Sequence, residues 1–430
     1  MTDMSFSQLA LPTGSCLSYQ EGQLCLESVP LAQVVAAHGS PVFVYSKAAM
    51  LKALSAYQRG MQGRRSSIHY AVKANSSLGI LKVFADAGCG FDIVSEGELS
   101  RVLHVGADPK RVVFSGVGKT EREMRLALQH GIGCFNVESL PELHALNAVA
   151  LSMGVQAPVS LRINPNVDAQ THPYISTGLK DNKFGIAHED AMAAYQLAHA
   201  LPGLKVCGID CHIGSQITQS TPFLDAMDKI LDLVVELESA GITLEHIDFG
   251  GGLGIDYKGE TPPSADALWQ ALWQRVDSRG LGQKLFMTEP GRSLVGNAGL
   301  CLTQVIYLKE GAHKNFCIVD AAMNDLPRPA MYQAFHQIVP ISLRGDDTPK
   351  TTWDVVGPVC ESGDWLGRDR ELACEPGDVL AVLSAGAYSM SMASEYNSRP
   401  KLAEVLVDGD QFRCIRQRNT IQDLWHNETP

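Results

Sequence analysis

A lysine ends a short apolar run in the segment SSIHYAVKANSS, residues 66–77. The run SIHYAV has the composition of a buried strand, and small polar residues follow Lys73 directly. A lysine that only faced solvent would not need this position. An amine held at the end of a strand can form a Schiff base with a carbonyl group. Lys73 is therefore the first candidate for chemistry.

Two glycine-bearing segments, DFGGGLGIDY and EPGR, are the second candidate feature. Their key residues are Gly250, Gly251, Gly252, Glu289, Pro290, Gly291 and Arg292. The glycine run fits neither the dinucleotide-binding pattern nor a P-loop, because it lacks the last glycine of the first and the Lys-Ser/Thr of the second. Glycine nevertheless lets backbone N–H groups approach phosphate oxygens closely, and Ser215 in HIGSQ adds a hydroxyl. A flexible turn without a ligand is the alternative.

Eight β-rich runs alternate with helical segments and would position these groups. They are residues 67–72, 91–94, 112–115, 133–137, 159–163, 206–212, 244–249 and 285–289. This alternation predicts βαβ units with a parallel sheet. Eight such units favour a closed (β/α)8 TIM-like barrel over an open, doubly wound sheet, so the fold class is α/β.

The candidate residues lie where such a barrel carries its chemistry, at the C-terminal ends of the strands. Lys73 follows the first predicted strand, Asp92 lies in the second, and His212 ends the sixth. The glycine run follows the seventh strand and the EPGR turn follows the eighth, where barrels often bind a phosphate. We expect all of these groups at one rim.

A phosphate site that faces a strand-end lysine fits pyridoxal 5′-phosphate (PLP). Its aldehyde condenses with a lysine amine, and its ring withdraws electrons from the α-carbon of an amino acid. Glu289 could keep the ring nitrogen protonated, and His212 could stack on the ring. A metal site at Cys207, Cys211 and His212 is disfavoured, because alternate strand residues face opposite ways, and we expect no metal.

After about residue 300 the sequence becomes mostly β. Strand-like runs such as CLTQVIYL and KLAEVLVDG are separated by Gly, Asp and Pro, and PAMYQAFHQ has a helical pattern. The N-terminal runs SCLSYQ and GQLCLES are candidates to join the same domain. We expect a barrel over residues 47–300 and a mostly β domain, a β-sandwich or small barrel, formed by residues 1–46 and 301–430.

Composition limits the class of protein. The 430 residues are 45% hydrophobic and 19% charged, which is ordinary for a globular protein. A net charge of −12 disfavours nonspecific nucleic-acid binding. We expect no secretory signal and no membrane helix, because no run is apolar and long enough. The eleven cysteines form no C-x-x-C pair, which fits reduced thiols in a cytoplasmic protein.

Taken together, these motifs resemble those of the fold-type III PLP-dependent decarboxylases, with an alanine-racemase-like barrel. The lysine motif YAVKAN stands at residues 70–75. Other matching segments are GFDIVSEGEL, LRINPNVD, KFGI, HIGSQ, GGGLGIDY, EPGRSLV, NDLPRPAMY, GPVCESGDWL and GAYSMSMASEYNSRPKLAEVLVDG. The last three are most similar to the branch that acts on meso-2,6-diaminopimelate. The resemblance thus implies release of CO2 from that substrate to give L-lysine.

The resemblance also implies roles for single side chains. Lys73 matches the Schiff-base lysine, His212 the ring-stacking histidine and Glu289 the partner of the pyridine nitrogen. The implied cofactor contacts, to which we add Asp92 and Gly251 from their strand-end positions, are Ser215, Gly252, Pro290, Gly291, Arg292 and Tyr388. The implied substrate contacts are Arg292, Arg328, Tyr332, Glu361 and Tyr388. Cys360 matches the proton donor.

Members of this family are dimers, so the resemblance implies a homodimer whose sites lie between subunits and include the partner's Cys360. Two alternatives remain open. One is a relative that acts on ornithine, arginine, a carboxylated polyamine or a siderophore precursor. The other is a catalytically inactive homologue that binds PLP. Two arginines beside an acid favour a substrate whose distal end carries both a carboxylate and an ammonium group.

Overall fold

The computed structural model describes residues 11–169, 171–172, 175, 177–178, 182–345 and 348–430. The chain divides into two compact units. Unit 2 consists of Leu54–Ile255 and Thr261–Ser293, and unit 1 consists of Met1–Ala53, Asp256–Glu260 and Leu294–Pro430.

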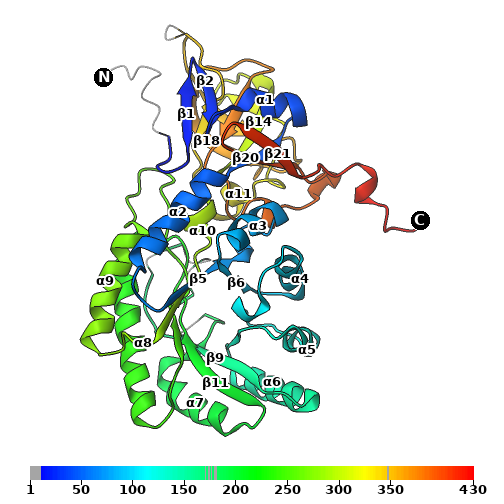
Figure 1. Ribbon diagram of the computed structural model, residues 1–430. Helices are drawn as coiled ribbons and strands as arrows, with labels where there is room; N and C mark the ends of the chain where they lie inside the picture. The colour runs from blue at the N-terminus through cyan, green and yellow to red at the C-terminus, as the bar shows by residue number, and fades with distance from the viewer. Residues whose placement is uncertain (1–10, 170, 173–174, 176, 179–181, 346–347) are drawn as a thin grey trace. The chain divides into compact units, whose positions relative to one another are not determined.

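Eight parallel strands of unit 2 close into a barrel (Figure 1). In hydrogen-bonded order they are β5 (Ser66–Ala71), β6 (Gly90–Ile93), β7 (Val112–Phe114), β8 (Cys134–Val137), β9 (Ala157–Asn164), β11 (Leu204–Asp210), β12 (His246–Asp248) and β13 (Leu285–Thr288). Pairing of β13 with β5 closes the ring, and a short strand, β10 (Ile186–Ala187), adds to β9. The predicted barrel is confirmed, with its strands in the predicted places.

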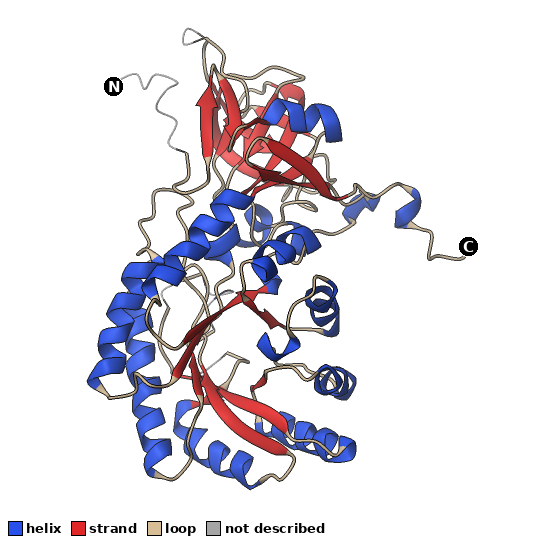
Figure 2. Cartoon of the chain, viewed as in Figure 1, coloured by secondary structure: helices blue, strands red, loops and turns tan. Residues whose placement is uncertain are grey.

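The helices of unit 2 lie outside the barrel strands, as Figure 2 shows. They are α3 (Leu78–Asp86), α4 (Glu96–His104), α5 (Glu121–His130), α6 (Leu140–Met153), α7 (Ala191–Ala200), α8 (Thr221–Ser239) and α9 (Ala265–Ser278), while α2 (Lys47–Gly60) spans the boundary with unit 1. Local signals fix their ends. Thr120 and Glu123 form a capping box at the start of α5, and Gly131 ends it in the left-handed conformation. Short caps of this kind turn the chain back towards the next strand.

Unit 1 is built around a nine-stranded sheet with the order β18-β17-β15-β14-β4-β20-β21, while β19 pairs with β14 and β16. Its strands are β4 (Val42–Ser46), β14 (Gly299–Lys309), β15 (Phe316–Val319), β16 (Ile338–Pro340), β17 (Thr351–Val356), β18 (Trp365–Leu372), β19 (Val379–Val382), β20 (Ala403–Asp408) and β21 (Gln411–Arg416). The helices α1 (Leu31–His38) and α11 (Arg328–Tyr332) belong to this unit, and α10 (Arg292–Val295) spans the boundary between the units.

The N-terminal segment contributes to the β unit, as predicted, but through a different strand. β4 lies between β14 and β20, antiparallel to the first and parallel to the second. The predicted runs SCLSYQ and GQLCLES instead form β1 (Leu17–Gln20) and β2 (Gln23–Leu26), which make a separate three-stranded sheet with β3 (Val29–Pro30). That small sheet packs on the same apolar core as β4, β14 and β20.

Three details of unit 1 differ from the sequence prediction. β16 and β18 were not predicted, since β18 (WLGRDREL) is mostly polar and its neighbouring strand supplies the pairing. The helical pattern PAMYQAFHQ ends early, because Gln333 takes a left-handed conformation with φ +53°.

Among the described residues, no helix combines the length and the apolar character that a membrane crossing requires.

Candidate active site

Lys73 lies at the C-terminal end of β5, where the strand passes into a single turn of 3-10 helix, η2 (Val72–Ala74). Its Nζ donates a hydrogen bond to Oδ2 of Asp92, a fully buried carboxylate on the neighbouring strand β6. The Tyr70 hydroxyl donates a hydrogen bond to the carbonyl of Asn75 at 2.9 Å and so stabilises the turn that contains Lys73. The YAVKAN motif thus folds into a rigid support for one amine.

The EPGR turn lies directly against the lysine turn. The backbone N–H of Ala71 donates to the Pro290 carbonyl at 3.1 Å, and a Cβ placed on Gly291 would lie 2.9 Å from Cβ of Ala74. The glycine run packs on the other side of the same turn, because a Cβ on Gly251 would lie 2.3 Å from the Glu289 carbonyl oxygen. Lys73 and both glycine-bearing segments therefore share one rim of the barrel.

The loop after β11 completes a small cradle at this rim. Arg292 Nε and Nη2 donate to the Ser215 hydroxyl at 3.3 and 3.0 Å. Gly252 has φ +111°, and a Cβ there would lie 2.5 Å from the Gly214 carbonyl oxygen. The turns after β11, β12 and β13 thus meet backbone to backbone beside a buried arginine, which is the donor set that a phosphate group needs.

His212 presents a neutral imidazole to the same space. Its Nδ1 accepts a hydrogen bond from the Gly251 N–H at 3.1 Å, which places the ring proton on Nε2. Burial, followed by the positive charges of Arg162 and Lys73, holds the pKa of His212 well below its usual value. The ring therefore stays uncharged, as a flat stacking partner should.

Three buried carboxyl groups lie behind Lys73, with one ligand-capable oxygen of each within 4.8 Å of the others: Asp210, Asp248 and Glu289. Burial, followed by repulsion from Asp92, raises the pKa of Asp248 to about 7. Burial, followed by repulsion from Asp248, holds the pKa values of Asp210 and Glu289 well above the usual range. Glu289 Oε1 also accepts from Asn136 Nδ2 at 3.4 Å. The cluster therefore resists carrying a full negative charge on each of its three carboxyl groups.

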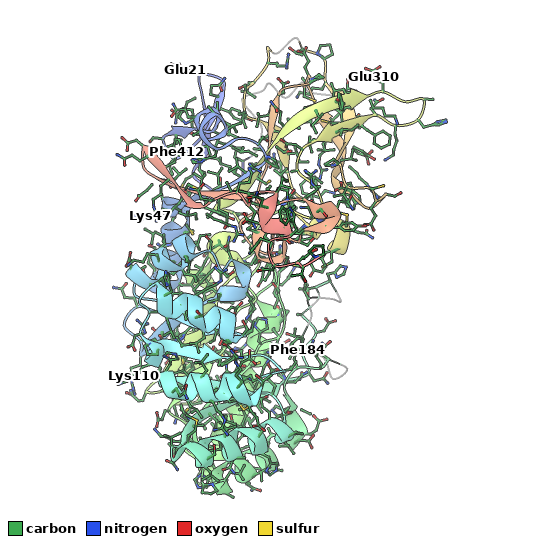
Figure 3. The ribbon with its side chains drawn as sticks, turned by 90° about the vertical axis from the view of Figure 1, so that its right-hand side faces the viewer. Glu21, Lys47, Lys110, Phe184, Glu310 and Phe412 are labelled. Carbon is green, nitrogen blue, oxygen red and sulfur yellow. The ribbon has the colours of Figure 1, made fainter. Side chains whose placement is uncertain are left out.

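Arg162 on β9 partly balances these acids. Its Nη1 lies 3.2 Å from Glu138 Oε1, and its Nε lies 3.9 Å from Asp210 Oδ2. Its guanidinium lies 5.0 Å from the centre of the Phe184 ring, and Figure 3 labels Phe184 on the side of the barrel opposite Lys110. These contacts with Glu138, Asp210 and Phe184 hold the Arg162 side chain in a fixed position.

Lys73, Glu289 and Arg162 belong to a layer of polar side chains inside the barrel, most of them buried. The sequence prediction missed several members of this layer, namely Asn136, Glu138, Asp210 and Asp248. A signal for two of them was present, because Asp210 and Asp248 are single acids within apolar runs that end barrel strands. The strand-end rule that selected Lys73 would have selected them as well.

The other predicted site residues lie in unit 1. Arg328, at the start of α11, is buried and donates through Nη1 to Nε2 of His336 at 2.9 Å. Its guanidinium stacks 4.5 Å above the Tyr257 ring. Tyr332 ends the same helix, and Tyr388 has the uncommon φ of +55°. Arg328 is therefore locked in position by aromatic and hydrogen-bond contacts.

Cys360 and Glu361 are exposed on a loop that is held in place by the buried Asp364. The buried Asp364 accepts from the backbone N–H groups of Val359 and Met323, each at 2.7 Å. A Cβ on Gly357 would lie 2.5 Å from Asp364 Oδ2. The CESGD motif thus holds the Cys360 thiol outward on a fixed support.

The barrel rim suits a cofactor with an aldehyde, a protonated ring nitrogen and a phosphate. Asp92 Oδ1, Asp248 Oδ2 and Asp210 Oδ1 are buried without a hydrogen-bond partner among the described residues. Such an excess of buried acid calls for an additional cation, and a pyridinium would supply one. Lys73 and the Ser215–Arg292 cradle match the other two groups.

Comparison with known proteins agrees with this geometry. Residues 47–296 match the family model described as pyridoxal-dependent decarboxylase, pyridoxal binding domain. The chain is 53% identical over 413 residues to the diaminopimelate decarboxylase of Vibrio cholerae serotype O1, covering 96% of this chain and 98% of that protein. It is also 53% identical over 412 residues to the enzyme of that name from Pseudomonas aeruginosa, with 96% and 98% covered.

Solved structures give the same result. The M. jannaschii diaminopimelate decarboxylase in co-complex with L-lysine has a TM-score of 0.92 at 37% identity, covering 97% of this chain and 99% of that chain. The Helicobacter pylori diaminopimelate decarboxylase complexed with L-lysine has a TM-score of 0.89 at 42% identity, covering 93% and 99%. The protein therefore belongs to the diaminopimelate decarboxylase family of pyridoxal-dependent decarboxylases.

Proposed function

We propose that this protein uses PLP to decarboxylate meso-2,6-diaminopimelate, giving L-lysine and CO2, the last step of lysine biosynthesis. The observation that carries the proposal is the single rim that joins the Lys73 amine, the neutral His212 ring and the buried Glu289. The named relatives and the lysine complexes of related enzymes support the choice of substrate.

Two sets of residues would hold the cofactor. Lys73 and Asp92 would hold the aldehyde end, and Ser215, Gly251, Gly252 and the 289–292 turn would hold the phosphate, with Tyr388 assigned to the same task from the family motif. When bound, PLP supplies an electron-withdrawing ring that stabilises negative charge at the substrate α-carbon once CO2 leaves. The Glu289 carboxylate would face the ring nitrogen and so would favour its protonated form.

The contacts at the rim orient the Lys73 amine and influence which side chains carry a proton. Asp92 accepts from Lys73 and keeps its amine aimed into the site. His212 stays uncharged, so it packs against a ring without repelling a protonated nitrogen. Asp248 and Asp210 lie beside Glu289 in one acidic cluster, and a nearby cation would favour the ionised form of its carboxyl groups.

Substrate choice rests on the distal end of the molecule, which bears a carboxylate and an ammonium group. We assign the carboxylate to Arg292, Arg328, Tyr332 and Tyr388, and the ammonium to Glu361. Cys360 is the proposed proton donor to the α-carbon, since a thiol can act as a general acid. The anchored CESGD loop supports this role by presenting the thiol outward.

The proposal extends to the assembly. We infer a cytoplasmic homodimer in which each site is completed by the partner's Cys360. The functional division is a PLP-binding barrel over residues 47–300 and a β domain over residues 1–46 and 301–430. Exposure of Cys360 and Glu361 supports this assembly, because a proton donor at the surface of one chain needs a second surface to enclose it.

A substrate panel tests the function directly. The PLP-loaded protein is incubated with meso-diaminopimelate, ornithine and arginine, and released CO2 and L-lysine are measured. We expect turnover with diaminopimelate alone. Preferential turnover of ornithine or arginine would make the protein a related decarboxylase instead, and cofactor binding without CO2 release from any of them would make it an inactive homologue.

A further inference from the structure

The opposite end of the barrel carries a second cluster of chemically active side chains. Cys134 begins β8, Cys207 lies in β11 and His246 begins β12. All three are buried, and one ligand-capable atom of each lies within 4.8 Å of the others. The two sulfur atoms are 3.7 Å apart. This cluster lies at the N-terminal ends of the strands, whereas Lys73 and Glu289 lie at the C-terminal ends.

Local irregularities of the sheet bring the three side chains together. β11 pairs regularly with β9 except for a register shift between Val206 and Gly208, which leaves Cys207 as the bulged residue. A bulge changes the direction in which a side chain points. Gly208 also makes room for the imidazole of its register partner, because a Cβ there would lie 2.0 Å from His246 Nε2. The sequence VCG opposite a histidine thus builds the cluster.

The imidazoles of His246 and His69 border one cavity at this end of the barrel. His246 is 7% exposed, and its ring has no hydrogen-bond partner among the described residues. His69 Nδ1, which lines the same space, is likewise without one in that part of the chain. An unsatisfied buried polar group costs about 1–3 kcal/mol, so such groups normally have a ligand.

The ligand set and its spacing select a class of ion. Thiolate and imidazole are the preferred ligands of zinc, and a tetrahedral ion with metal–sulfur bonds of about 2.3 Å separates its two sulfur atoms by about 3.8 Å. Two thiolates also neutralise a divalent ion, which suits the apolar neighbours Val113 and Met287. An adjoining cavity of about 380 Å³, lined by Cys134 and His246, leaves an approach and a fourth position.

We propose that Cys134, Cys207 and His246 form a binding site for zinc or a similar thiophilic divalent cation at the N-terminal end of the barrel. Binding forms two metal–sulfur bonds and one metal–nitrogen bond and releases the two thiol protons to solvent. The ion would tie β8, β11 and β12 together, so its role is structural. This site differs from the set Cys207, Cys211 and His212, for which the sequence favoured no metal.

The test uses the full-length, PLP-loaded protein, reduced and treated with a chelator. Cobalt(II) is added stepwise, and the visible d–d absorption of thiolate-bound, tetrahedral cobalt is followed. We expect saturation at one equivalent per chain, displacement by zinc, and a higher midpoint of thermal unfolding with zinc. In Cys207→Ala and His246→Gln we expect at least about a tenfold loss of zinc affinity, with decarboxylation largely unchanged.

The matched control is Cys301→Ala, which removes an equally buried thiol from β14 of unit 1 and should leave cobalt binding intact. Retained decarboxylation in each variant shows that the barrel is folded. Equal cobalt absorption in wild type and both variants would overturn the proposal. So would the absence of metal binding by the reduced protein, which would leave the cluster as a water-filled thiol pair, or recovery of the as-isolated protein with a Cys134–Cys207 disulfide. None of these results would bear on the PLP chemistry at the other rim.

Discussion

At the residue scale, the site combines the Lys73 amine with a larger number of buried acidic side chains. Lys73 and Arg162 are cations of the layer, while Asp92, Glu138, Asp210, Asp248 and Glu289 are acids of it. Burial and mutual repulsion shift the pKa values of the last three acids in the direction that stores protons. A further cation would favour ionisation of these acids, and the raised pKa of Asp248 makes the layer sensitive to pH before any substrate binds.

Replacement of Lys73 by alanine should reduce CO2 release from diaminopimelate by at least about 10³-fold, because the residue is the proposed covalent anchor of the cofactor. Borohydride reduction of the wild-type holoenzyme should attach the cofactor to the peptide that contains Lys73, as detected by mass spectrometry. The control Lys82→Ala removes an exposed lysine on α3 and should keep full turnover. Full turnover by Lys73→Ala would refute the assignment.

Replacement of Cys360 by alanine should slow turnover by about 10²–10⁴-fold, as expected for loss of a general acid, without weakening cofactor binding. Steady-state kinetics and a titration with PLP separate the two effects. Cys414→Ala, another partly exposed thiol of unit 1, is the control. If Cys360→Ala instead lost the cofactor, the thiol would be a binding residue and not a proton donor.

The raised pKa of Asp248, about 7, predicts how the cofactor-free protein responds to pH. A carboxyl group whose pKa is higher in the folded state stabilises that state below its unfolded pKa, and the contribution is lost as pH rises through the folded pKa. The thermal midpoint of the cofactor-free protein should therefore fall as pH rises from about 4 to above about 7. Asp248→Asn should flatten this slope. An equal slope in the variant would assign the effect to other groups.

At the scale of elements, the rim depends on loops that touch through their backbones. Gly251 tests this directly, because it lacks a positive φ and its replacement by alanine adds crowding alone. Overpacking of about 1–3 kcal/mol would displace the EPGR turn and weaken PLP binding by about 5- to 150-fold. Gly118→Ala is the matched control, since a Cβ there meets nothing within 4 Å. Equal PLP affinity in both variants would contradict the packing argument.

The secondary-structure elements also show how much of the fold and of the site could be predicted from the sequence. All eight barrel strands were predictable, because each is a short apolar run between helical segments, and the rim residues followed from their strand-end positions. β4 was not predicted, although VFVYS is fully buried, because it precedes the helix α2 and its partners lie at the far end of the chain. The roles of Asp210 and Asp248 depend on which carboxyls meet inside the barrel, and a linear pattern does not contain that distance.

At the scale of the whole molecule, the proposed homodimer makes a prediction that single chains cannot fulfil. Lys73→Ala and Cys360→Ala proteins, each strongly impaired alone, should recover activity when they are mixed and allowed to exchange subunits. Random exchange leaves about a quarter of the sites with both residues intact. Activity assays and sedimentation of the mixture measure this. Dimers that exchange without recovery would place both residues of a site on one chain.

The position of β4 has a consequence for how the chain is made. This strand leaves the ribosome early, yet its two neighbours begin at residues 299 and 403. Until both arrive, the apolar VFVYS segment has two open edges, and the barrel sequence is translated in the meantime. A chain interrupted before residue 403 would keep one edge open and invite pairing with other nascent chains, so early termination should yield aggregates even when the barrel sequence is complete.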